Sequence, residues 1–145
     1  MKLRAPVYLV IGEIACWKCK TPTAVAGLLA ERTADEDIPC MVSEVAGIDD
    51  GVLAFIQSHV PNYRLGYSKM AGESYLANHC PSCGIIQGDF FLHSEPGGPF
   101  FPVEPREAAE LNIVRLPVDG DLELDAALHR GGIELILNNA QPIKY

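Results

Sequence analysis

Apolar and polar positions alternate with a short period along most of this sequence, and the pattern predicts more strand than helix. Residues 7–11 are continuously apolar and rich in β-branched and aromatic side chains, which is typical of a strand covered on both faces. Residues 63–69 alternate between apolar and polar, which predicts a half-buried strand, and residues 74–79 predict the strand that returns beside it. Further short strands are expected at 41–46 and 112–116.

Residues 23–30 are apolar without a clear period, and two structures compete for them. Thr21 could cap a helix that has Pro22 at its first position. Gly27 would cost the middle of such a helix about 1 kcal/mol relative to alanine. We favour a strand here, with the helix as the alternative, and we expect a polar loop at 31–37.

Three segments predict helices. The clearest begins at residues 49–50, two aspartates that suit a helix N-terminus, and ends before Pro61. Its apolar face is formed by residues at helical spacing, namely Val52, Phe55, Ile56 and His59. We expect His59 to be a helix-end histidine rather than a metal ligand. Shorter helices are expected at 105–111 and 133–137.

The rest of the second half gives weaker signals. Residues 89–93 cannot be assigned to helix or strand, and residues 119–120 predict a turn, after which 122–124 continue the sheet. Residues 94–102 combine glycine and proline with two phenylalanines, and we expect this loop to pack on the body of the protein. Together these patterns predict an α+β fold with an antiparallel sheet and a few short helices, in a single domain spanning 1–145.

The charge of the chain limits the classes of partner that we expect it to bind. The net charge is −8, from 19 acidic and 11 basic residues, and the acids gather at 31–50 and 104–125. A basic footprint of the kind that follows a phosphate backbone is lacking, because Lys18 and Lys20 could contact only a phosphate or two. We therefore expect a protein partner rather than a nucleic acid.

The sequence predicts a cytoplasmic protein. No stretch approaches the roughly 20 consecutive apolar residues that span a bilayer. The basic residues at 2–4, followed by the apolar run at 7–11, resemble the start of an export signal. That run is only five residues long and Glu13 stands where it should continue, so we favour the cytoplasm.

Two cysteine pairs carry the most specific chemistry, Cys16 with Cys19 and Cys80 with Cys83. Cysteines in a cytosolic chain indicate metal or redox chemistry rather than structural disulfides. Four thiolates satisfy a tetrahedral zinc ion, and the two-residue gap lets both sulfurs of a pair converge on it. Cys40 lies alone in an apolar run, and we expect it to be a small buried side chain.

The spacing between the pairs is unusual, because sixty residues separate Cys19 from Cys80 where small zinc ribbons place about 15 to 20. The longer loop adds about 2 kcal/mol or less of closure entropy. Structural zinc contributes on the order of 10–16 kcal/mol in peptides, so the insertion is tolerable. We expect residues 20–79 to fold with the rest of the domain.

The segments around the cysteines resemble known metal knuckles. Residues 80–84, Cys-Pro-Ser-Cys-Gly, resemble the knuckle shared by zinc ribbons and rubredoxins, whereas residues 16–20 match less closely because Lys20 stands where glycine is common. Over residues 13–25 and 75–93, the pairing resembles that of small uncharacterised bacterial proteins with a split four-cysteine zinc ribbon. The resemblance implies a metal-supported fold with a sixty-residue insertion and carries no activity.

Three alternatives remain for the cysteines. Iron in a rubredoxin-like site would make the protein an electron carrier. A redox-active disulfide would fit the order strand, Cys-Trp-Lys-Cys, Pro22 and helix, but would leave the second pair unexplained. A catalytic zinc needs an open position, which His79 could create only by replacing a cysteine. Asp89, His93 and Glu95 lie close in sequence, and we expect them to be surface or capping groups.

These observations favour a structural zinc site in a non-enzymatic, protein-interaction or adaptor module. The long segment between the cysteine pairs is the first place where we expect a contact surface, and the loop at 96–102 is a candidate if it does not pack on the body. A thiol-disulfide or rubredoxin-like redox protein is the first alternative. A zinc ribbon that binds nucleic acid through Trp17, Lys18 and Lys20 is the second.

Overall fold

The computed structural model describes residues 1–69 and 72–143 of the chain, and strands dominate it. In chain order the elements are β1 (Lys2–Ala15), β2 (Pro22–Thr33), β3 (Cys40–Gly47), α1 (Asp50–His59), β4 (Tyr63–Ser68), β5 (Glu73–His79), β6 (Ile86–Gln87), the π-helix η1 (Phe90–Ser94), α2 (Pro105–Ala109), β7 (Asn112–Arg115), β8 (Asp121–Glu123), β9 (Asp125–His129), α3 (Ile133–Asn139) and β10 (Gln141–Pro142). The balance of many strands and few short helices confirms the expected α+β class.

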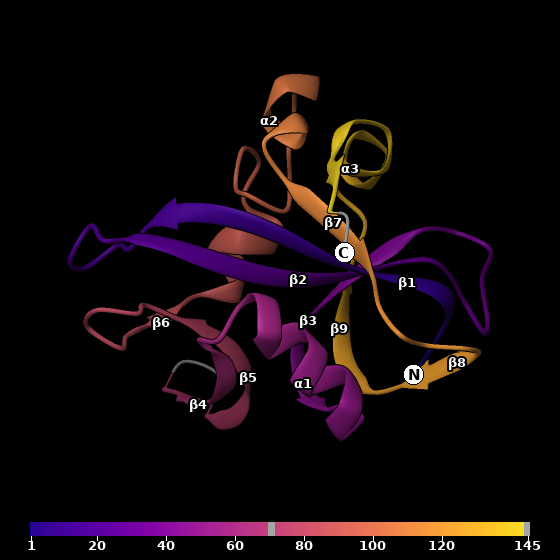
Figure 1. Cartoon of the computed structure of the whole chain (residues 1–145), viewed down its shortest axis with the longest axis horizontal. Helices are drawn as coiled ribbons and strands as arrows, with labels where there is room; N and C mark the ends of the chain where they lie inside the picture. Colours follow the sequence, from indigo (N-terminus) through magenta and orange to yellow (C-terminus); the bar gives the residue numbers. More distant parts are fainter. Residues whose placement is uncertain (70–71, 144–145) are drawn as a thin grey trace.

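The sheet is mixed but mainly antiparallel. Its strands follow the order β10-β7-β1-β2-β3-β5-β4, and β8, β9 and β6 pair with β1, β3 and β5 respectively. Among the described strands, the β10–β7 pair is parallel and the others are antiparallel. Figure 1 shows the long β1–β2 hairpin across the middle of the molecule, with α2 and α3 on one side and α1, β4 and β5 on the other.

Both faces of β1 are buried, as its continuous apolar sequence predicts. Leu9 packs into the cluster that also contains α1, whereas its neighbour Val10 packs into the cluster that contains Ile136 of α3. Successive side chains of a strand point to opposite faces, so one apolar run serves two cores. The segment 23–30 is a strand, which settles the choice between strand and helix.

Two details of the sheet differ from expectation. β2 continues to Thr33, where a loop was expected from residue 31, because Arg32 and Thr33 pair with the first residues of β1. β9 was not predicted, since its five residues, Asp-Ala-Ala-Leu-His, show no alternation of apolar and polar positions. It pairs with β3 at residues 41–43 and again at Gly47. The ladder is irregular between these points, where Glu44 adopts a φ of 53° and Val45 pairs with Leu76 of β5.

The helix and loop predictions in this part of the fold are confirmed. Asp49 caps α1 by accepting a hydrogen bond from the Val52 N–H at 3.1 Å, and His59 ends the helix. The glycine- and proline-rich loop packs onto the body, since Phe100 is 1% exposed and belongs to the core cluster beneath α3. Within the described ranges, no helix has the length and apolar character needed to cross a membrane.

Candidate metal centre

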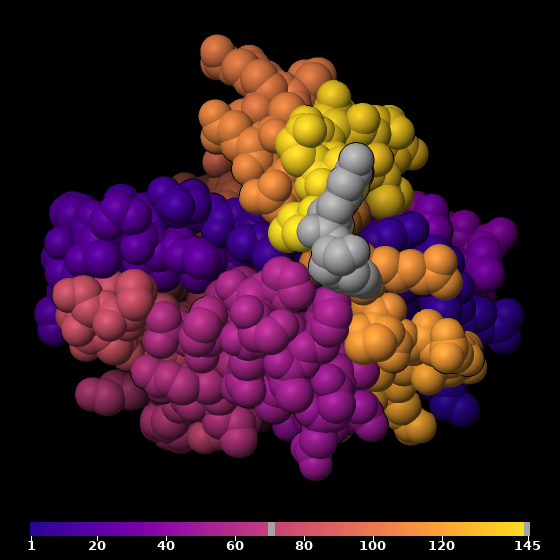
Figure 2. Space-filling model, in the orientation of Figure 1, coloured from indigo at the N-terminus to yellow at the C-terminus, as the bar shows by residue number. Residues whose placement is uncertain are grey.

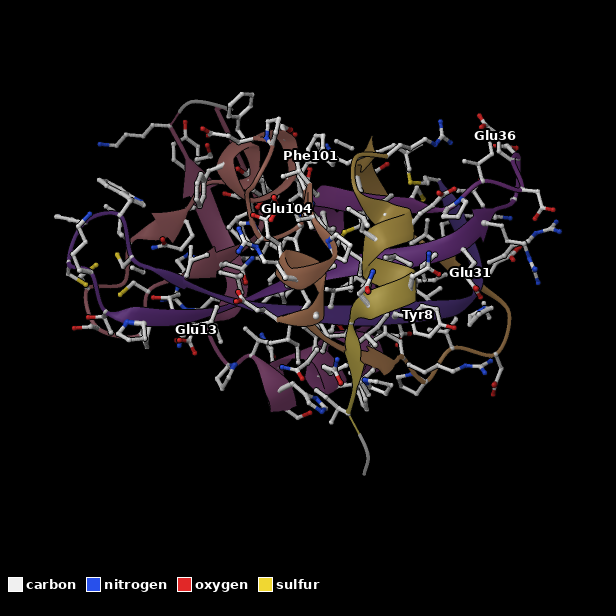
Figure 3. All side chains as sticks on the ribbon, turned by 90° about the horizontal axis from the view of Figure 1, so that it is seen from above. Tyr8, Glu13, Glu31, Glu36, Phe101 and Glu104 are labelled. Carbon is white, nitrogen blue, oxygen red and sulfur yellow. The ribbon has the colours of Figure 1, made fainter. Side chains whose placement is uncertain are left out.

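The four paired cysteines lie at the tips of two hairpins that the fold brings together. Cys16 and Cys19 occupy the turn between β1 and β2, and Cys80 and Cys83 occupy the turn between β5 and β6. In Figure 3 the sulfur atoms gather at the tip of the long β1–β2 hairpin, and in Figure 2 the chain that follows β5 lies against this tip. Segments far apart in sequence thus meet at one point.

The sulfur positions fit one tetrahedral ion. The four Sγ atoms all lie within 4.8 Å of one another. The Cys16 and Cys83 sulfurs are 3.7 Å apart, and the Cys19 and Cys80 sulfurs are 3.4 Å apart. A regular tetrahedron of four thiolates at the usual Zn–S distance of about 2.3 Å has sulfurs about 3.8 Å apart. The arrangement therefore suits a metal ion held by all four side chains.

The two turns have the same backbone structure. In the first, the Cys16 N–H donates to the Thr21 carbonyl at 3.0 Å and the Lys20 N–H to the Cys16 carbonyl at 2.9 Å. In the second, the equivalent bonds join Cys80 to Ile85 at 2.9 Å and Gly84 to Cys80 at 3.0 Å. Lys20 and Gly84 are both left-handed, with φ of 67° and 75°. The first pair is therefore a full knuckle although lysine occupies the glycine position.

Backbone N–H groups converge on the sulfurs. The Lys18 N–H lies 3.4 Å from the Cys16 sulfur, and the Ser82 N–H lies 3.4 Å from the Cys80 sulfur. Burial raises the pKa of Cys16, but hydrogen bonds from the backbone of Cys19 and Lys18 and from a glutamine outweigh it and lower the pKa to about 6. Such donors stabilise a thiolate, which is the form that binds metal.

Gln87 is a site residue that the sequence analysis missed. It is 1% exposed, and its Nε2 lies 3.4 Å from the Cys16 sulfur and 3.2 Å from the Ile85 carbonyl. Its Oε1 has no hydrogen-bond partner among the described residues. A buried amide that touches a metal-binding thiolate orients that ligand and holds its charge. Only its position, four residues after Cys83 in an apolar stretch, could have signalled this role.

The other candidate ligands lie outside the cluster. The His79 ring is turned away, with Nδ1 2.9 Å from the Ala77 carbonyl and 3.1 Å from the Asn62 carbonyl. Cys40 is fully buried in the core against α1, where burial raises the pKa of its thiol. The metal site is thus confined to the four paired cysteines in the part of the chain that the structure describes.

A second polar cluster corrects the expectation for Asp89 and His93, which are buried rather than on the surface. The Asp89 carboxylate accepts a hydrogen bond from the Glu44 N–H at 2.8 Å, and burial raises the pKa of Asp89 to about 6. His93 lies in the π-helix and stacks on His129, with ring centroids 5.0 Å apart. Its Nδ1 has no partner among the described residues, and burial lowers the pKa of His93 to about 3. Glu95, two residues further, is exposed as expected.

Four thiolates leave no open position on a tetrahedral ion, so a metal held by all four cysteines would have no site for a substrate. Soft sulfur ligands favour zinc, iron or Cu(I) over magnesium or calcium. All five cysteines are free thiols, so the sulfurs are available for a metal. Comparisons of this protein with protein-family models, curated proteins and solved structures found no match.

Proposed function

We propose that this is a cytoplasmic zinc-binding protein in which one structural ion, held by Cys16, Cys19, Cys80 and Cys83, joins two hairpins of a protein-interaction module. The observation that carries the proposal is the set of four sulfur atoms within 4.8 Å of one another. The two knuckles form a split zinc ribbon, and the sixty residues between them form the insertion.

In this arrangement the zinc would connect two parts of the chain that are distant in sequence. The β1–β2 hairpin is long, and its tip meets the chain after β5 at the four cysteines and at the hydrogen bond from the Trp17 Nε1 to the Ile86 carbonyl. A four-thiolate site supplies that connection, since its binding energy is available only when both tips meet. In this proposal the ion therefore has a structural role: it holds together a surface formed by both tips and takes no part in a reaction.

An interaction role is supported by the aromatic and aliphatic side chains that stay exposed. The most exposed of them are Phe90, Leu65, Tyr67 and Trp17. The loop at 96–102, a candidate contact surface from the sequence, packs into the core through Phe100 and so is not the one we propose. Trp17, Leu65 and Tyr67 belong to the knuckle or to the segment between the knuckles.

Metal analysis of the purified protein tests the zinc proposal. We expect about one zinc per chain, a colourless protein, and the charge-transfer absorbance of a four-thiolate site after replacement by Co²⁺. Cys80→Ser should lose the zinc and unfold, whereas Cys40→Ala, the matched control outside the site, should keep it. A metal-free protein whose Cys80→Ser variant melts like the parent would contradict the proposal. A coloured ferric site would favour the rubredoxin-like alternative.

A further inference from the structure

The outer edge of β4 is an open end of the sheet. β4 pairs with β5 on one side and ends the strand order. In this ladder the Asn62 carbonyl accepts a hydrogen bond from the His79 N–H at 3.1 Å. Hydrogen-bonded and non-hydrogen-bonded pairs alternate in an antiparallel ladder, so the backbone groups of residues 64, 66 and 68 face β5 and those of 63, 65 and 67 face outward.

Two of these three outward-facing residues have free backbone groups. Tyr63 is satisfied, because its N–H donates to the Val60 carbonyl at 3.1 Å and its carbonyl accepts from the Gln57 Nε2 at 3.0 Å. The outward backbone groups of Leu65 and Tyr67 have no such partner among residues 1–69 and 72–143. Figure 1 shows β4 at the lower border of the molecule, outside β5.

This edge lacks most of the features that usually protect one. Soluble proteins protect exposed edges with charged side chains, especially lysine, or with proline, a bulge or a covering loop. Within its six residues β4 has no lysine, proline or bulge, and its ladder with β5 has no register shift; Arg64 is its one charged residue. Leu65 and Tyr67 are 62% and 61% exposed, so the free backbone groups lie between exposed apolar side chains. An extended segment of another chain could complete this edge.

A groove opens beside the same strand. It has a volume of about 610 Å³, and its apolar wall includes Trp17, Tyr67, Tyr75, Ile85 and Ile86. The Trp17 Nε1 donates to the Ile86 carbonyl at 2.9 Å, which fixes the indole between the two knuckles. Side chains of a β-strand alternate between two faces, so every second residue of an added strand could reach this groove.

The charge of the edge indicates the kind of segment that fits. Arg64 and Lys69 are exposed on either side of the Leu65–Tyr67 pair, and neither forms an ion pair within the described ranges. The β4–β5 ladder carries one acid, Glu73. A second copy of the chain fits less well, because each copy has a net charge of −8. A peptide with an apolar side chain for the groove and an acidic one for the cations fits best.

We propose that β4 binds an extended peptide segment by strand addition, with main-chain hydrogen bonds to Leu65 and Tyr67, an apolar or aromatic side chain in the Trp17–Tyr75 groove, and an acidic residue near Arg64 or Lys69. This inference rests on the interaction role proposed above and names its partner class. The main chain supplies affinity and the groove supplies specificity, as in other strand-addition complexes.

The test is selection of a display library of random short peptides on the zinc-loaded protein. Enriched peptides should carry alternating apolar residues and an acid, and should protect the amides of residues 65 and 67 from hydrogen exchange. Leu65→Pro removes one outward N–H, and Leu65→Lys adds a charge to the edge without that backbone change. Each variant should weaken binding about tenfold or more, whereas Leu128→Lys, on an exposed leucine of β9, should not.

N-methylation of the selected peptides separates main-chain pairing from simple apolar contact. Methylating amides on the edge that faces β4 should abolish binding, whereas methylating those on the opposite edge should leave it unchanged. The inference is overturned if no peptide is enriched, if Leu65→Lys binds as well as the parent, or if β4 instead pairs two copies of the chain in solution. Zinc content measured on the same preparation shows separately whether the metal proposal holds.

Discussion

The two knuckles have nearly the same backbone but different surroundings. Each buries its first cysteine, Cys16 or Cys80, and exposes its second, Cys19 or Cys83. Each closes with the same pair of backbone hydrogen bonds. The position after the second cysteine differs in sequence but is left-handed in both knuckles. The comparison shows that the hydrogen bonds and the sulfur positions define the knuckle, and that glycine after the second cysteine is favourable but not required.

The chain that leaves each knuckle differs more. The first knuckle leads into β2, whose residues 25–30 are apolar or glycine and buried. The second leads into β6 and the π-helix, where Gln87, Asp89 and His93 are buried, and where the Gln87 Oε1 and the His93 Nδ1 have no hydrogen-bond partner among the described residues. Buried polar groups reduce stability unless they serve a local purpose. We therefore expect the chain after the second knuckle to be less stable by itself than the chain after the first.

The largest effect should come from removing the buried sulfurs. Cys16→Ser and Cys80→Ser should both release zinc and unfold the protein, since structural zinc contributes on the order of 10–16 kcal/mol and an ordinary domain has about 5–15 kcal/mol in total. Cys19→Ser and Cys83→Ser alter exposed positions, where water can complete the coordination. These two should bind zinc more weakly but refold in excess zinc, as followed by circular dichroism during zinc titration.

If the two buried variants lose the same amount of zinc affinity and stability, and the two exposed variants do likewise, the two knuckles contribute equally to the site. If Cys19→Ser and Cys83→Ser were as damaging as the buried variants, the fold would require all four thiolates, and water could not replace an exposed one. If the Cys16→Ser protein kept its zinc while the Cys80→Ser protein lost it, the two knuckles would not share one ion. Cys40→Ala serves as the control in each titration, because Cys40 lies outside the cluster.

The next effect concerns the buried acid and base after the second knuckle. Burial lowers the pKa of His93 from 6.5 to about 3, so between these values the unfolded chain binds the extra proton and stability falls as the pH is lowered. Burial raises the pKa of Asp89 from 3.8 to about 6, so in that window the folded chain holds the extra proton and stability falls as the pH rises. The two slopes oppose each other in the parent protein.

Single substitutions should uncover each slope. Asp89→Asn should become less stable by about 1.4 kcal/mol per pH unit as the pH falls below 6.5, and His93→Gln should lose a similar amount as the pH rises from 3.8 to 6. Urea unfolding of both variants over this range measures the difference, in which the shared titration of the thiolates cancels. Parallel pH profiles for the two variants would show that these groups are not held as the structure indicates.

A smaller effect is expected from Gln87, whose Nε2 contacts the Cys16 sulfur of the first knuckle; no equivalent glutamine contacts Cys80 among the described residues. Gln87→Met keeps a similar volume but removes the N–H donor. Loss of such a second partner typically weakens metal binding about 10- to 100-fold, measurable by competition with a chelator. Gln57→Met, which removes an amide bonded to the Tyr63 carbonyl away from the sulfurs, is the control and should leave zinc affinity unchanged.

Sequence patterns predicted the elements best where one local signal decided the structure. Asp49 and Pro61 bracketed α1, and the apolar run at 7–11 located β1. The strand extension to Thr33 was missed because it depends on pairing with residues 3 and 4, which no local pattern contains. The cysteine spacing identified the candidate ligands, but the role of Gln87 and the burial of the polar groups after it depend on packing between distant segments.

The smallest effect concerns the position after the second cysteine, which is lysine in the first knuckle and glycine in the second. Lys20 holds a φ of 67°, a conformation that costs a residue with a Cβ about 1–2 kcal/mol and glycine almost nothing. Lys20→Gly should therefore raise the free energy of unfolding by about 1 kcal/mol.

Gly84→Ala is the reverse change, with φ 75° and no atom within 4 Å of the added Cβ, so strain alone should lower stability by a similar amount. Opposite shifts of the midpoint in urea, at equal zinc content, would show that both knuckles require the left-handed residue. If Lys20→Gly were instead destabilising, the lysine side chain would stabilise the folded state by more than its backbone strain destabilises it. The contact responsible would be the hydrogen bond from the Lys20 Nζ to the Trp17 carbonyl, at 3.3 Å.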